Sequence, residues 1–518
     1  MQEHSYGQGR PTGNRRLYGN KPGLPYACDS KECFLCSQPT WAGRTVIHCS
    51  ENGTMHAREL FEAQRSAFRP NASSYLERIA ALKALERALL DHKDVIVRSI
   101  SEDYRGRAAE ETLALELVPT LCEIREARKH LKNWMETRAV PVGWQFQPAR
   151  ARIEMQPKGV VGILGAWNYP LFLTIGPAVG AIAAGNRVMI KPSEIAPRTA
   201  TLLQQMIEKT FPADYICAIN GGADVAEDFS RLPFDHLIYT GSARVGKLVM
   251  KAAAENLTPV TLELGGKSPA LVHSDYPLER AAERILTGKL YNAGQTCVAP
   301  DYLLIAQSRL DEFLRIAPLI IWKMYPKLVE NPDYTRIIDG AHYRLLEQLL
   351  ADATQKGATV VQINPANETC NEENQVFPPT LVHNVRDDMA VMRDEIFGPI
   401  LPIVTYGTLD GAIDYINAHP HPLALYYFDS NNARVKDVLA RTTAGGVTVN
   451  DCIFHVGQTG LPFGGIGASG MGHYHGYHGF ETLSKKKGVF IEGRWTPLSL
   501  LRPPYGAMAR RILAFLVK

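Results

Sequence analysis

The sequence predicts an α/β protein with two open sheets, each built mainly from parallel strands. Short apolar segments alternate with helix-like segments from about residue 159 to residue 460, which is the pattern of strands joined by crossover helices. The length of 518 residues also exceeds the roughly 250–300 residues at which one hydrophobic core stops growing. We therefore expect two domains, or one domain with appendages.

The first periodic part of the chain, over 57–134, predicts helices. Apolar residues recur at intervals of three and four in YLERIAALKALERALLDHKDVIVRSI and in EETLALELVPTLCEIREARKHLKNWM, which is typical of helices with one face on a core. RIEMQPKGVVGILGA follows. It predicts an extended segment, a turn at Pro157-Lys158-Gly159 and a buried strand of the kind found in parallel sheets.

The segment 159–186 carries no charge and is long enough to span a bilayer, which takes ~20 apolar residues. Asn-Tyr-Pro at 168–170 and Gly-Pro at 176–177 interrupt it. Such residues divide the segment into a short strand, a loop and a helix of small residues. We predict a buried strand–loop–helix unit and no membrane span.

Strand-like segments NRVMIKP, YICAIN and HLIYTGS then alternate with helix-like segments, and a second such run extends from TPVTLELGGKSPALV to about residue 460. The glycine-rich LPFGGIGASGMGHYHGYHG after this run predicts a surface arm and no core helix. The final RPPYGAMARRILAFLVK predicts an amphipathic helix that packs on the protein or on a partner subunit.

Charge and cysteine content limit the partners and the compartment. Lys+Arg number 56 and Asp+Glu number 53, so no charge excess points to nucleic acid or to a membrane surface. The N-terminus lacks the apolar run of a secretory signal, and the nine cysteines are an odd number spread over a long chain. We expect a cytoplasmic protein with free thiols and a small-molecule partner.

Residues 1–54 differ from the rest, since they are rich in Gly, Pro, Asn and Ser and show little periodicity. Four cysteines in this stretch raise the alternative of a zinc site: Cys28, Cys33, Cys36 and Cys49. Their spacing lacks paired C-x2-C regularity, so we favour a disordered or non-native extension and assign no metal. A translation start at Met55 is a third interpretation.

Two strand ends are candidates for binding a dinucleotide. Gly241 to Gly246 read GSARVG between a strand and a helix, where backbone N–H groups can hold a pyrophosphate. The spacing is not G-x-G-x-x-G, so a plain glycine cap is the alternative. Lys191 and Glu194 follow another strand in MIKPSE, at a place where ribose hydroxyls would be bound, although either charge alone is more often solvated.

Three residues are candidates for reaction chemistry. Glu263 ends a strand in TLELGGKSP, where partial burial would raise its pKa and suit it to act as a general base, although a strand-end Glu facing water is the alternative. Cys297 follows in NAGQTCVAPD, and Glu395 follows in RDEIFGP. Taken alone, Cys297 is more readily a small buried thiol.

Together these segments resemble the aldehyde dehydrogenase superfamily, whose motifs they match in order and approximate spacing: GAWNYP, IKPSE, YTGSARVG, LELGGKSP, NAGQTCVAPD, DEIFGPI and LPFGGIGASGMG. The Ala-Pro-Asp after Cys297, the NYP of the first motif and GGVTVND near the end are similar to the class 3 branch. Within that branch the RPPYG tail and the segment around GSARVG look most like bacterial coniferyl aldehyde dehydrogenases. The resemblance runs from about residue 57 to the C-terminus and leaves residues 1–54 without a counterpart.

The resemblance implies catalytic roles. Cys297 is the nucleophile whose thiolate adds to the aldehyde carbonyl, with a depressed or cofactor-sensitive pKa. The Asn168 side chain and the Cys297 backbone N–H form the oxyanion hole. Collapse of the oxyanion passes a hydride to the nicotinamide and leaves a thioester, which water activated by Glu263 hydrolyses to the acid.

The resemblance also implies cofactor contacts and architecture. Glu194 favours NAD, because a carboxylate repels a 2′-phosphate, and NADP is the alternative. The implied fold has an NAD(P)-binding domain over 55–262, a catalytic domain over 263–460 and a C-terminal arm and tail over 461–518; residues 140–157 join the arm in a β bridge of a homodimer. The implied cofactor residues are Lys191 and Glu194 at the adenosine ribose, Gly241, Ser242 and Gly246 at the pyrophosphate, and Glu395 and Phe397 at the nicotinamide.

The implied reaction is the NAD(P)-dependent oxidation of an aldehyde to its acid, with coniferyl aldehyde to ferulate as the predicted case. Trp167, Tyr169 and Phe454 would line an aromatic channel for it, and we interpret Cys452, near the presumed channel mouth, as structural. A medium- or long-chain fatty aldehyde dehydrogenase is the alternative within the branch. A binding protein on the same scaffold is the alternative from another class, and the intact catalytic set counts against it.

Overall fold

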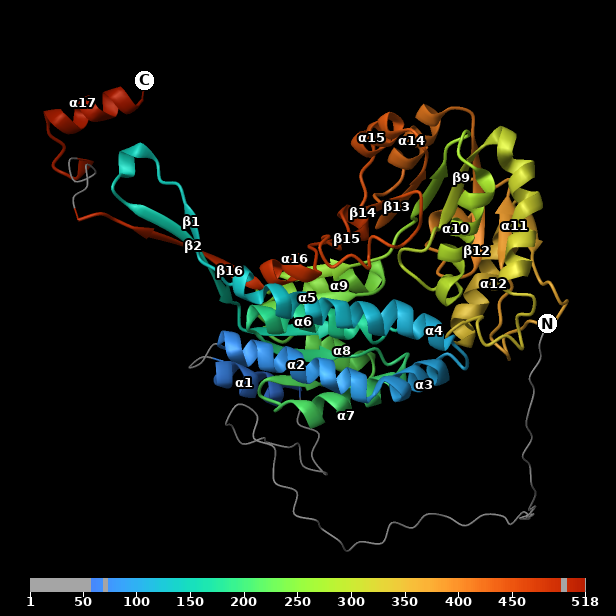
Figure 1. Ribbon diagram of the computed structural model, residues 1–518, viewed down its shortest axis with the longest axis horizontal. Coiled ribbons are helices and arrows are strands. Elements are labelled where there is room, and N and C mark those ends of the chain that lie inside the picture. Colours follow the sequence, from blue (N-terminus) through green and yellow to red (C-terminus); the bar gives the residue numbers. More distant parts are fainter. Residues whose placement is uncertain (1–56, 69–72, 495–500, 518) are drawn as a thin grey trace, which may run out of the picture.

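A computed structural model describes residues 57–68, 73–494 and 501–517 (Figure 1). Their strands form a six-stranded sheet, a seven-stranded sheet and a three-stranded sheet. The two large sheets are each covered by helices, whereas the small one extends from the body as a ribbon (Figure 1). The two open α/β sheets predicted from the sequence are therefore both present.

The six-stranded sheet has the order β15-β7-β6-β3-β4-β5, with β15 antiparallel at one edge and the other five strands parallel. The chain runs from β3 to β4 and β5 and then crosses to β6 and β7, so the topological switch lies between β3 and β6. Open α/β sheets bind ligands outside the carboxyl ends of their strands at such a switch. The strands are β3 (Val160–Leu164), β4 (Arg187–Lys191), β5 (Ile216–Ala218), β6 (His236–Thr240), β7 (Val260–Glu263) and β15 (Gly470–Met471).

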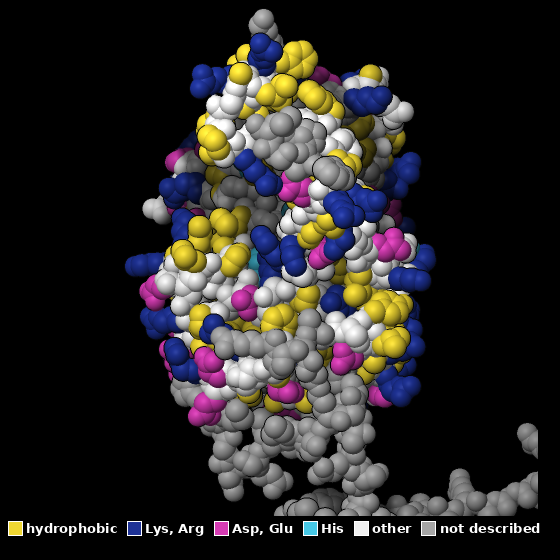
Figure 2. All heavy atoms as spheres, turned by 90° about the vertical axis from the view of Figure 1, so that its left-hand side faces the viewer, with side chains coloured by type: hydrophobic (Ala, Val, Ile, Leu, Met, Phe, Trp, Pro, Cys, Tyr) yellow, Lys and Arg dark blue, Asp and Glu magenta, His cyan; other side chains and the backbone are white. Residues whose placement is uncertain are grey.

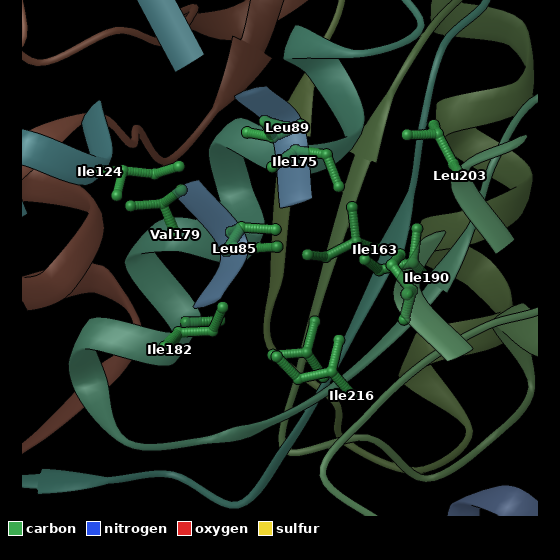
Figure 3. Packing of buried hydrophobic residues seen from close by; sticks show 14 of the residues in the cluster. Leu85, Leu89, Ile124, Ile163, Ile175, Val179, Ile182, Ile190, Leu203 and Ile216 are labelled. Carbon is green, nitrogen blue, oxygen red and sulfur yellow. The ribbon is translucent and has the colours of Figure 1, made fainter. Parts of the chain in front are cut away.

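Helices pack on both faces of this sheet because successive strand residues point to opposite sides. Val161 and Ile163 of β3 join the core beneath α2, α5 and α6, part of which Figure 3 shows, while Val160 and Leu164 join the core beneath α1, α8 and α9. The helices of this half are α1 (Ala57–Phe68), α2 (Tyr75–Asp91), α3 (Lys93–Asp103), α4 (Ala109–Thr112), α5 (Val118–Trp134), α6 (Phe172–Ala184), α7 (Pro197–Thr210), α8 (Ala223–Ser230) and α9 (Ala243–Ala254). A five-residue π-helix, Leu113–Leu117, joins α4 to α5.

The uncharged segment 159–186 forms β3, a loop and α6, as predicted. Every residue of β3 is buried, and so is every residue of α6 except Gly180; Ile175, Val179 and Ile182 of α6 lie in the cluster of Figure 3. In the part of the chain that the structure describes, no helix combines the length and the apolar character needed to cross a membrane.

The seven-stranded sheet has the order β10-β11-β12-β9-β8-β13-β14, with β10 antiparallel and the rest parallel. Its strands are β8 (Pro269–Val272), β9 (Tyr302–Ala306), β10 (Thr359–Gln362), β11 (Thr380–His383), β12 (Ile400–Tyr406), β13 (Ala424–Phe428) and β14 (Gly446–Val449). α10 and α11 pack on one face, and α12, α14 and α15 on the other. These helices are α10 (Leu278–Leu290), α11 (Leu310–Met324), α12 (Gly340–Gln355), α14 (Leu409–Asn417) and α15 (Asn432–Arg441), and a short α13 (Ala390–Arg393) precedes β12.

The three-stranded sheet is an antiparallel ribbon of β1 (Arg138–Val140), β2 (Arg150–Pro157) and β16 (Ser484–Ile491). The register of β2 with β16 runs from Pro157 opposite Ser484 to Arg150 opposite Ile491. Beyond the ribbon, α17 (Ala507–Leu516) lies away from the body of the protein (Figure 1). The predicted amphipathic helix therefore exists, and the described chain does not fold it back onto the two large sheets.

The glycine-rich segment after residue 460 packs into the body, so the prediction of a surface arm there is wrong. Its β15 pairs with β7, and its α16 (Gly476–Thr482) packs against α5 and α6. Phe463, Tyr474 and Phe480 are buried. The glycines allow close backbone approach: a Cβ on Gly464 would lie 2.8 Å from the His473 Cα.

Candidate active site

Four strands of the six-stranded sheet end at one edge, and each places a predicted site residue there. β3 leads to Asn168, β4 ends at Lys191, β6 leads to Gly241, and β7 ends at Glu263. The carboxyl ends of parallel strands share an edge, so these four residues gather at one side of the sheet. Cys297 reaches the same place from the other half of the molecule, on the loop after α10.

The loop that carries Cys297 is held in a left-handed conformation. Asn292 and Ala293 have φ values of 53° and 50°, and Gly294 has a φ of 76°. A side chain at Gly294 would lie within 2.5 Å of the Gly398 backbone. The Gln295 side chain bridges the loop to its surroundings, since it donates to the Asn292 and Arg336 carbonyls at 2.9 and 3.0 Å. Such strained, over-determined backbone is typical of functional loops.

Cys297 itself is half-buried. Burial raises the pKa of its thiol to about 12, and the negative charges of Glu395 and Glu263 raise it further, against hydrogen bonds from the Cys297 and Val298 N–H groups. We expected a depressed or cofactor-sensitive pKa, and this arrangement of residues does not depress it. The physical reason is first the burial of the thiol and then the two facing carboxylates, all of which oppose formation of a thiolate.

Asn168 is tied directly to the cysteine loop. Its side chain is 3% exposed, and the Nδ2 atom donates to the Gln295 carbonyl at 3.2 Å. Its carbonyl accepts hydrogen bonds from the Tyr104 hydroxyl at 3.0 Å and from the Asn292 side chain at 3.0 Å. The side chain of the predicted oxyanion donor thus contacts the loop that carries the predicted nucleophile, two residues before it.

Arg107 and Glu116 are site-supporting residues that the sequence reasoning missed. They form a fully buried ion pair of 2.7 Å. The Arg107 guanidinium also donates to the Asn168 carbonyl at 3.3 Å, and the second Glu116 oxygen accepts from the N–H groups of Leu171 and Phe172 at 2.7 and 3.3 Å. The pair therefore fixes the loop that carries Asn168.

Glu111 does the same for the cysteine loop, since it accepts hydrogen bonds from the Asn292 N–H at 3.0 Å and from the Thr335 hydroxyl at 2.8 Å. Glu116 lies in the π-helix between α4 and α5, and π-helical turns are frequent at functional sites. The available signal in the sequence was a carboxylate at a buried helical position in EETLALELVP.

Glu263 is 2% exposed at the end of β7, and neither carboxylate oxygen has a hydrogen-bond partner among the described residues. Burial raises its pKa well above the ordinary value of a glutamate. A buried carboxylate without a fixed partner is suited to take a proton from water, so the geometry agrees with the predicted general base and not with a glutamate facing water.

The predicted pyrophosphate turn has a tight glycine cradle. Gly241 has a φ of 157°, and a Cβ there would lie 2.7 Å from the Tyr239 Cζ. A Cβ on Gly246 would lie 2.7 Å from the Leu264 Cδ2. Ser242 caps α9 by accepting a hydrogen bond from the Val245 N–H. The N-terminus of a helix that follows such a turn fits a phosphate anion.

The two candidate ribose sites differ in exposure. Lys191 is 2% exposed and pairs with Glu194, whose side chain is 43% exposed, at 2.5 Å. Glu395 packs against Gly265, where its carboxylate fills the place of a Cβ, and its Oε1 atom is buried without a partner among the described residues. An orphaned buried acceptor of this kind fits a sugar hydroxyl.

Phe397 lies beside Glu395 in a left-handed conformation with a φ of 53°. Its ring contacts the Trp167 ring edge to face, with centroids 5.3 Å apart, and Trp167 also contacts His342 at 4.8 Å. Trp167 therefore packs on the side of the predicted nicotinamide residues.

The remaining cysteines of the described residues show no catalytic arrangement. Cys452 is buried, which agrees with a structural role, and Cys217 is buried in the core of the six-stranded sheet. Among the described residues no group of His, Cys, Asp or Glu is arranged to hold a metal ion. The four N-terminal cysteines considered for zinc lie outside the described residues.

Comparison with known proteins gives a consistent result. The sequence profile of the aldehyde dehydrogenase family matches residues 26–489. The match begins upstream of residue 57, so the expectation that the first 54 residues have no counterpart is wrong for residues 26–54. A protein of Pseudomonas aeruginosa named probable coniferyl aldehyde dehydrogenase is 48% identical over 88% of this chain and 94% of its own length. Aldehyde dehydrogenase family 3 member A2 of Rattus norvegicus is 40% identical over 83% of this chain and 87% of its own.

Solved structures agree with these relatives. The substrate-bound AldH of Staphylococcus aureus is similar with a TM-score of 0.84 and 38% identity, over 89% of this chain and 100% of that chain. A cysteine-to-alanine mutant of the indole-3-acetaldehyde dehydrogenase AldA of P. syringae, solved with NAD+ and IAA, has a TM-score of 0.76 at 26% identity, over 84% of this chain and 89% of that chain.

Proposed function

This chain belongs to the aldehyde dehydrogenase family, and we propose that Cys297, Asn168 and Glu263 carry out the oxidation of its aldehyde substrate to the carboxylic acid. The observation that carries the assignment is the meeting of three groups from different parts of the chain. Asn168 donates to the carbonyl of Gln295, two residues before Cys297, and Glu263 raises the pKa of the same cysteine.

In the first step the Cys297 thiol loses its proton to solvent, its sulfur adds to the aldehyde carbon, and the carbonyl oxygen becomes an oxyanion. The Asn168 side-chain N–H and the Cys297 backbone N–H are the donors that stabilise it. NAD, when bound, supplies the acceptor for the hydride that the adduct releases, and two electrons leave with that hydride. The carbon remains bound to Cys297 as a thioester.

Glu263 completes the reaction by hydrolysis. Its carboxylate takes a proton from water, the oxygen attacks the thioester carbon, and the acid leaves as the Cys297 thiol is restored. Because burial raises the pKa of Glu263, the fraction present as carboxylate increases with pH through an elevated range. A dehydrogenase that transferred the acyl group to coenzyme A would have no use for a base at this place.

A direct test compares wild type with Cys297→Ala and Glu263→Gln, following both reduced cofactor and acid. Cys297→Ala is expected to abolish both products. Glu263→Gln is expected to keep one rapid turnover of cofactor reduction and to lose acid release. Full activity of Cys297→Ala would overturn the mechanism.

NAD is the proposed cofactor, with NADP as the alternative. The glycine cradle at Gly241 and Gly246 and the orphaned Glu395 acceptor support dinucleotide binding, and the relative from P. syringae was solved with NAD+. Glu194, exposed beside Lys191, opposes a 2′-phosphate by like charge. Initial rates with NAD and with NADP decide between them.

Coniferyl aldehyde is the proposed substrate. Tyr169, Phe172 and Leu173 form an apolar cluster against which Leu115 and Val456 pack, and Val456 also contacts the core that contains Cys297. Phe454, on the same loop as Val456, is 53% exposed and free to cover a flat aromatic ring. The name of the Pseudomonas aeruginosa relative agrees with this substrate. Trp167 packs beside Phe397, so we leave it out of the channel.

A fatty aldehyde is the alternative substrate, because an apolar cluster also accepts an alkyl chain. The specificity ratio separates the two, measured as kcat/KM for coniferyl aldehyde and for decanal. A much higher value for decanal would overturn the coniferyl assignment. A Phe454→Ala variant is expected to lower kcat/KM for coniferyl aldehyde more than for acetaldehyde, which does not reach the residue.

We further propose a cytoplasmic homodimer. The ribbon and α17 expose large apolar side chains that a monomer leaves in water: Trp144 is 68% exposed, Phe490 is 51% exposed, and Phe515 is 71% exposed. Figure 2 shows groups of apolar side chains between charged ones on the side of the molecule that carries these elements. Contiguous exposed apolar surface marks an interaction site. Light scattering on the purified chain measures the oligomer, and a monomer would refute the proposal.

A further inference from the structure

Asn292 is a buried amide to which the reaction described above assigns no part. It lies in the loop that carries Cys297, and its exposed fraction is 0%. Its Oδ1 atom has no hydrogen-bond partner among the described residues. Because an unpaired buried acceptor costs about 1–3 kcal/mol, the presence of this side chain calls for an explanation.

The Nδ2 atom of Asn292 donates to two backbone carbonyls from distant parts of the chain. One is the carbonyl of Asn168, in the loop after β3, and the other is the carbonyl of Gln295, each at 3.0 Å. Carbonyl oxygens only accept, so the amide is oriented with its nitrogen toward them. Asn292 therefore bridges the loop that carries Asn168 and the loop that carries Cys297.

These contacts close a ring of hydrogen bonds around the proposed oxyanion donor. The side-chain Nδ2 atom of Asn168 donates to the Gln295 carbonyl at 3.2 Å, and the same carbonyl accepts from Asn292. Asn292 in turn donates to the backbone carbonyl of Asn168. Asn168 is thus held at its backbone and at its side chain. An amide nitrogen carries two N–H donors, so the one bonded to Gln295 leaves a second for the oxyanion.

The backbone of Asn292 is held on both sides. Its N–H donates to the buried Glu111 carboxylate at 3.0 Å. Its carbonyl accepts from the Gln295 N–H at 3.0 Å and from the Gln295 side chain at 2.9 Å. The Tyr104 hydroxyl, which accepts from the Asn292 Nδ2 atom at 3.3 Å, donates to the Asn168 carbonyl at 3.0 Å. The bridge therefore has little freedom to turn.

We propose that Asn292 is a positioning residue of the oxyanion hole, whose amide joins the two loops and fixes the direction of the Asn168 N–H bond that meets the oxyanion. This assignment rests on the role of Asn168 in the proposed function. Direction matters because hydrogen bonds weaken steeply when donor and acceptor are misaligned. Asn292 acts through Asn168 and the Gln295 carbonyl.

The competing explanation is that Asn292 serves only the left-handed turn, since its φ is 53° and Asn adopts this conformation more readily than most residues. Glycine adopts the same conformation without strain and has no amide, so Asn292→Gly separates the two explanations. Asn384→Gly is the matched control. Asn384 is exposed, has a φ of 58° and donates to the Thr359 hydroxyl at 3.2 Å.

The experiment measures the rate of cofactor reduction in the first turnover, by stopped flow with saturating NAD and aldehyde on the full chain. Asn292→Gly is expected to lower this rate at least tenfold, a part of the about 10²–10³-fold that loss of an oxyanion donor costs. Asn384→Gly is expected to keep the wild-type rate. In the Asn168→Ala background, Asn292→Gly is expected to have little further effect, because the group that it positions is absent.

Alkylation of Cys297 by iodoacetamide gives an independent readout, because it uses the thiol and forms no oxyanion. In Asn292→Gly the alkylation rate at a fixed pH is expected to stay close to that of wild type while aldehyde oxidation slows. The affinity for NAD, measured by calorimetry, is expected to stay unchanged as well. A general loss of structure would lower all three quantities together.

Three results would overturn the inference alone: a wild-type reduction rate in Asn292→Gly, an equal loss of rate with and without the Asn168 side chain, or alkylation that slows in parallel with oxidation. Asn168→Ala with a wild-type rate would instead overturn the role of Asn168 and the inference with it. If Asn292→Gly fails to fold, Asn292→Asp carries the same comparisons, since an aspartic acid keeps the shape but offers at most one donor for the two carbonyls.

Discussion

Removal of the buried Arg107 guanidinium tests whether the ion pair between Arg107 and Glu116 positions Asn168, the proposed oxyanion donor. Arg107→Met leaves Glu116 as a buried carboxylate without its cation, and breaking such a pair costs about 3–5 kcal/mol. The guanidinium also lies over the rings of Tyr104 and Tyr169, at 5.3 and 4.9 Å, and each contact contributes roughly 0.5–2 kcal/mol. Glu116 keeps its two backbone donors, which offsets part of the loss, so we expect destabilisation of about 4 kcal/mol.

The functional consequence passes through Asn168, whose carbonyl loses one of its donors. Displacement of an oxyanion donor lowers kcat by up to about 10²–10³-fold. We therefore expect kcat to fall at least tenfold, while the affinity for NAD, bound at other residues of the sheet edge, stays unchanged.

Urea unfolding followed by circular dichroism measures the stability of Arg107→Met, and steady-state kinetics measures kcat. Arg344→Met is the matched control, because its ion pair with Glu372 is exposed and contributes only ~0–1 kcal/mol. The reasoning is refuted if Arg107→Met loses no more stability than the control. A large loss of stability with an unchanged kcat would restrict Arg107 to a structural role.

Three further predictions concern the thiol, the base and the glycine turn. Burial and carboxylates raise the pKa of Cys297 to about 12. The rate of Cys297 alkylation by iodoacetamide is therefore expected to keep increasing above pH ~9, where the rate for an ordinary thiol levels off. A rate that levels off near the ordinary thiol pKa would contradict the raised pKa. In Glu263→Gln, acid release is expected to fall by about 10²–10⁴-fold. In wild type the rate of acid release increases with pH because of the raised pKa of Glu263, and the variant is expected to lose this increase, measured by stopped flow over a pH series. A retained increase would assign the titration to another group. Gly241→Ala is expected to weaken NAD binding, measured by calorimetry, about tenfold or more, because the new Cβ would lie 2.7 Å from the Tyr239 Cζ. Gly407→Ala is the control: its Cβ would meet nothing within 4 Å, so the affinity for NAD should stay unchanged.

The site residues that lie close to strand ends in the sequence were predictable from it. Glu263 ends a buried strand, Gly241 directly follows one, and Asn168 lies in the loop after one; an alternating α/β pattern brings the ends of such strands to one edge. The family motifs added Cys297, which arrives from the other half of the chain and which no local pattern connects to the edge.

Long-range contacts account for what the sequence did not reveal. Glu116 lies within a helical pattern, and only the fold shows that its oxygens meet Arg107 and the backbone of the Asn168 loop. We predicted a surface arm after residue 460 because a glycine-rich sequence is typical of loops. Its glycines instead allow the backbone to pack closely beside β7, a contact between distant residues that composition does not encode.

The pairing of β15 with β7 has a consequence for synthesis of the chain. Gly470 lies opposite Glu263, so the strand that ends in the proposed general base remains an open edge until residue 470 has left the ribosome. A truncated chain that stops earlier contains Cys297 and Glu395 but leaves the Glu263 strand uncovered and hydrated. A prematurely terminated product would thus carry the thiol while the strand that ends in Glu263 lacks its edge partner.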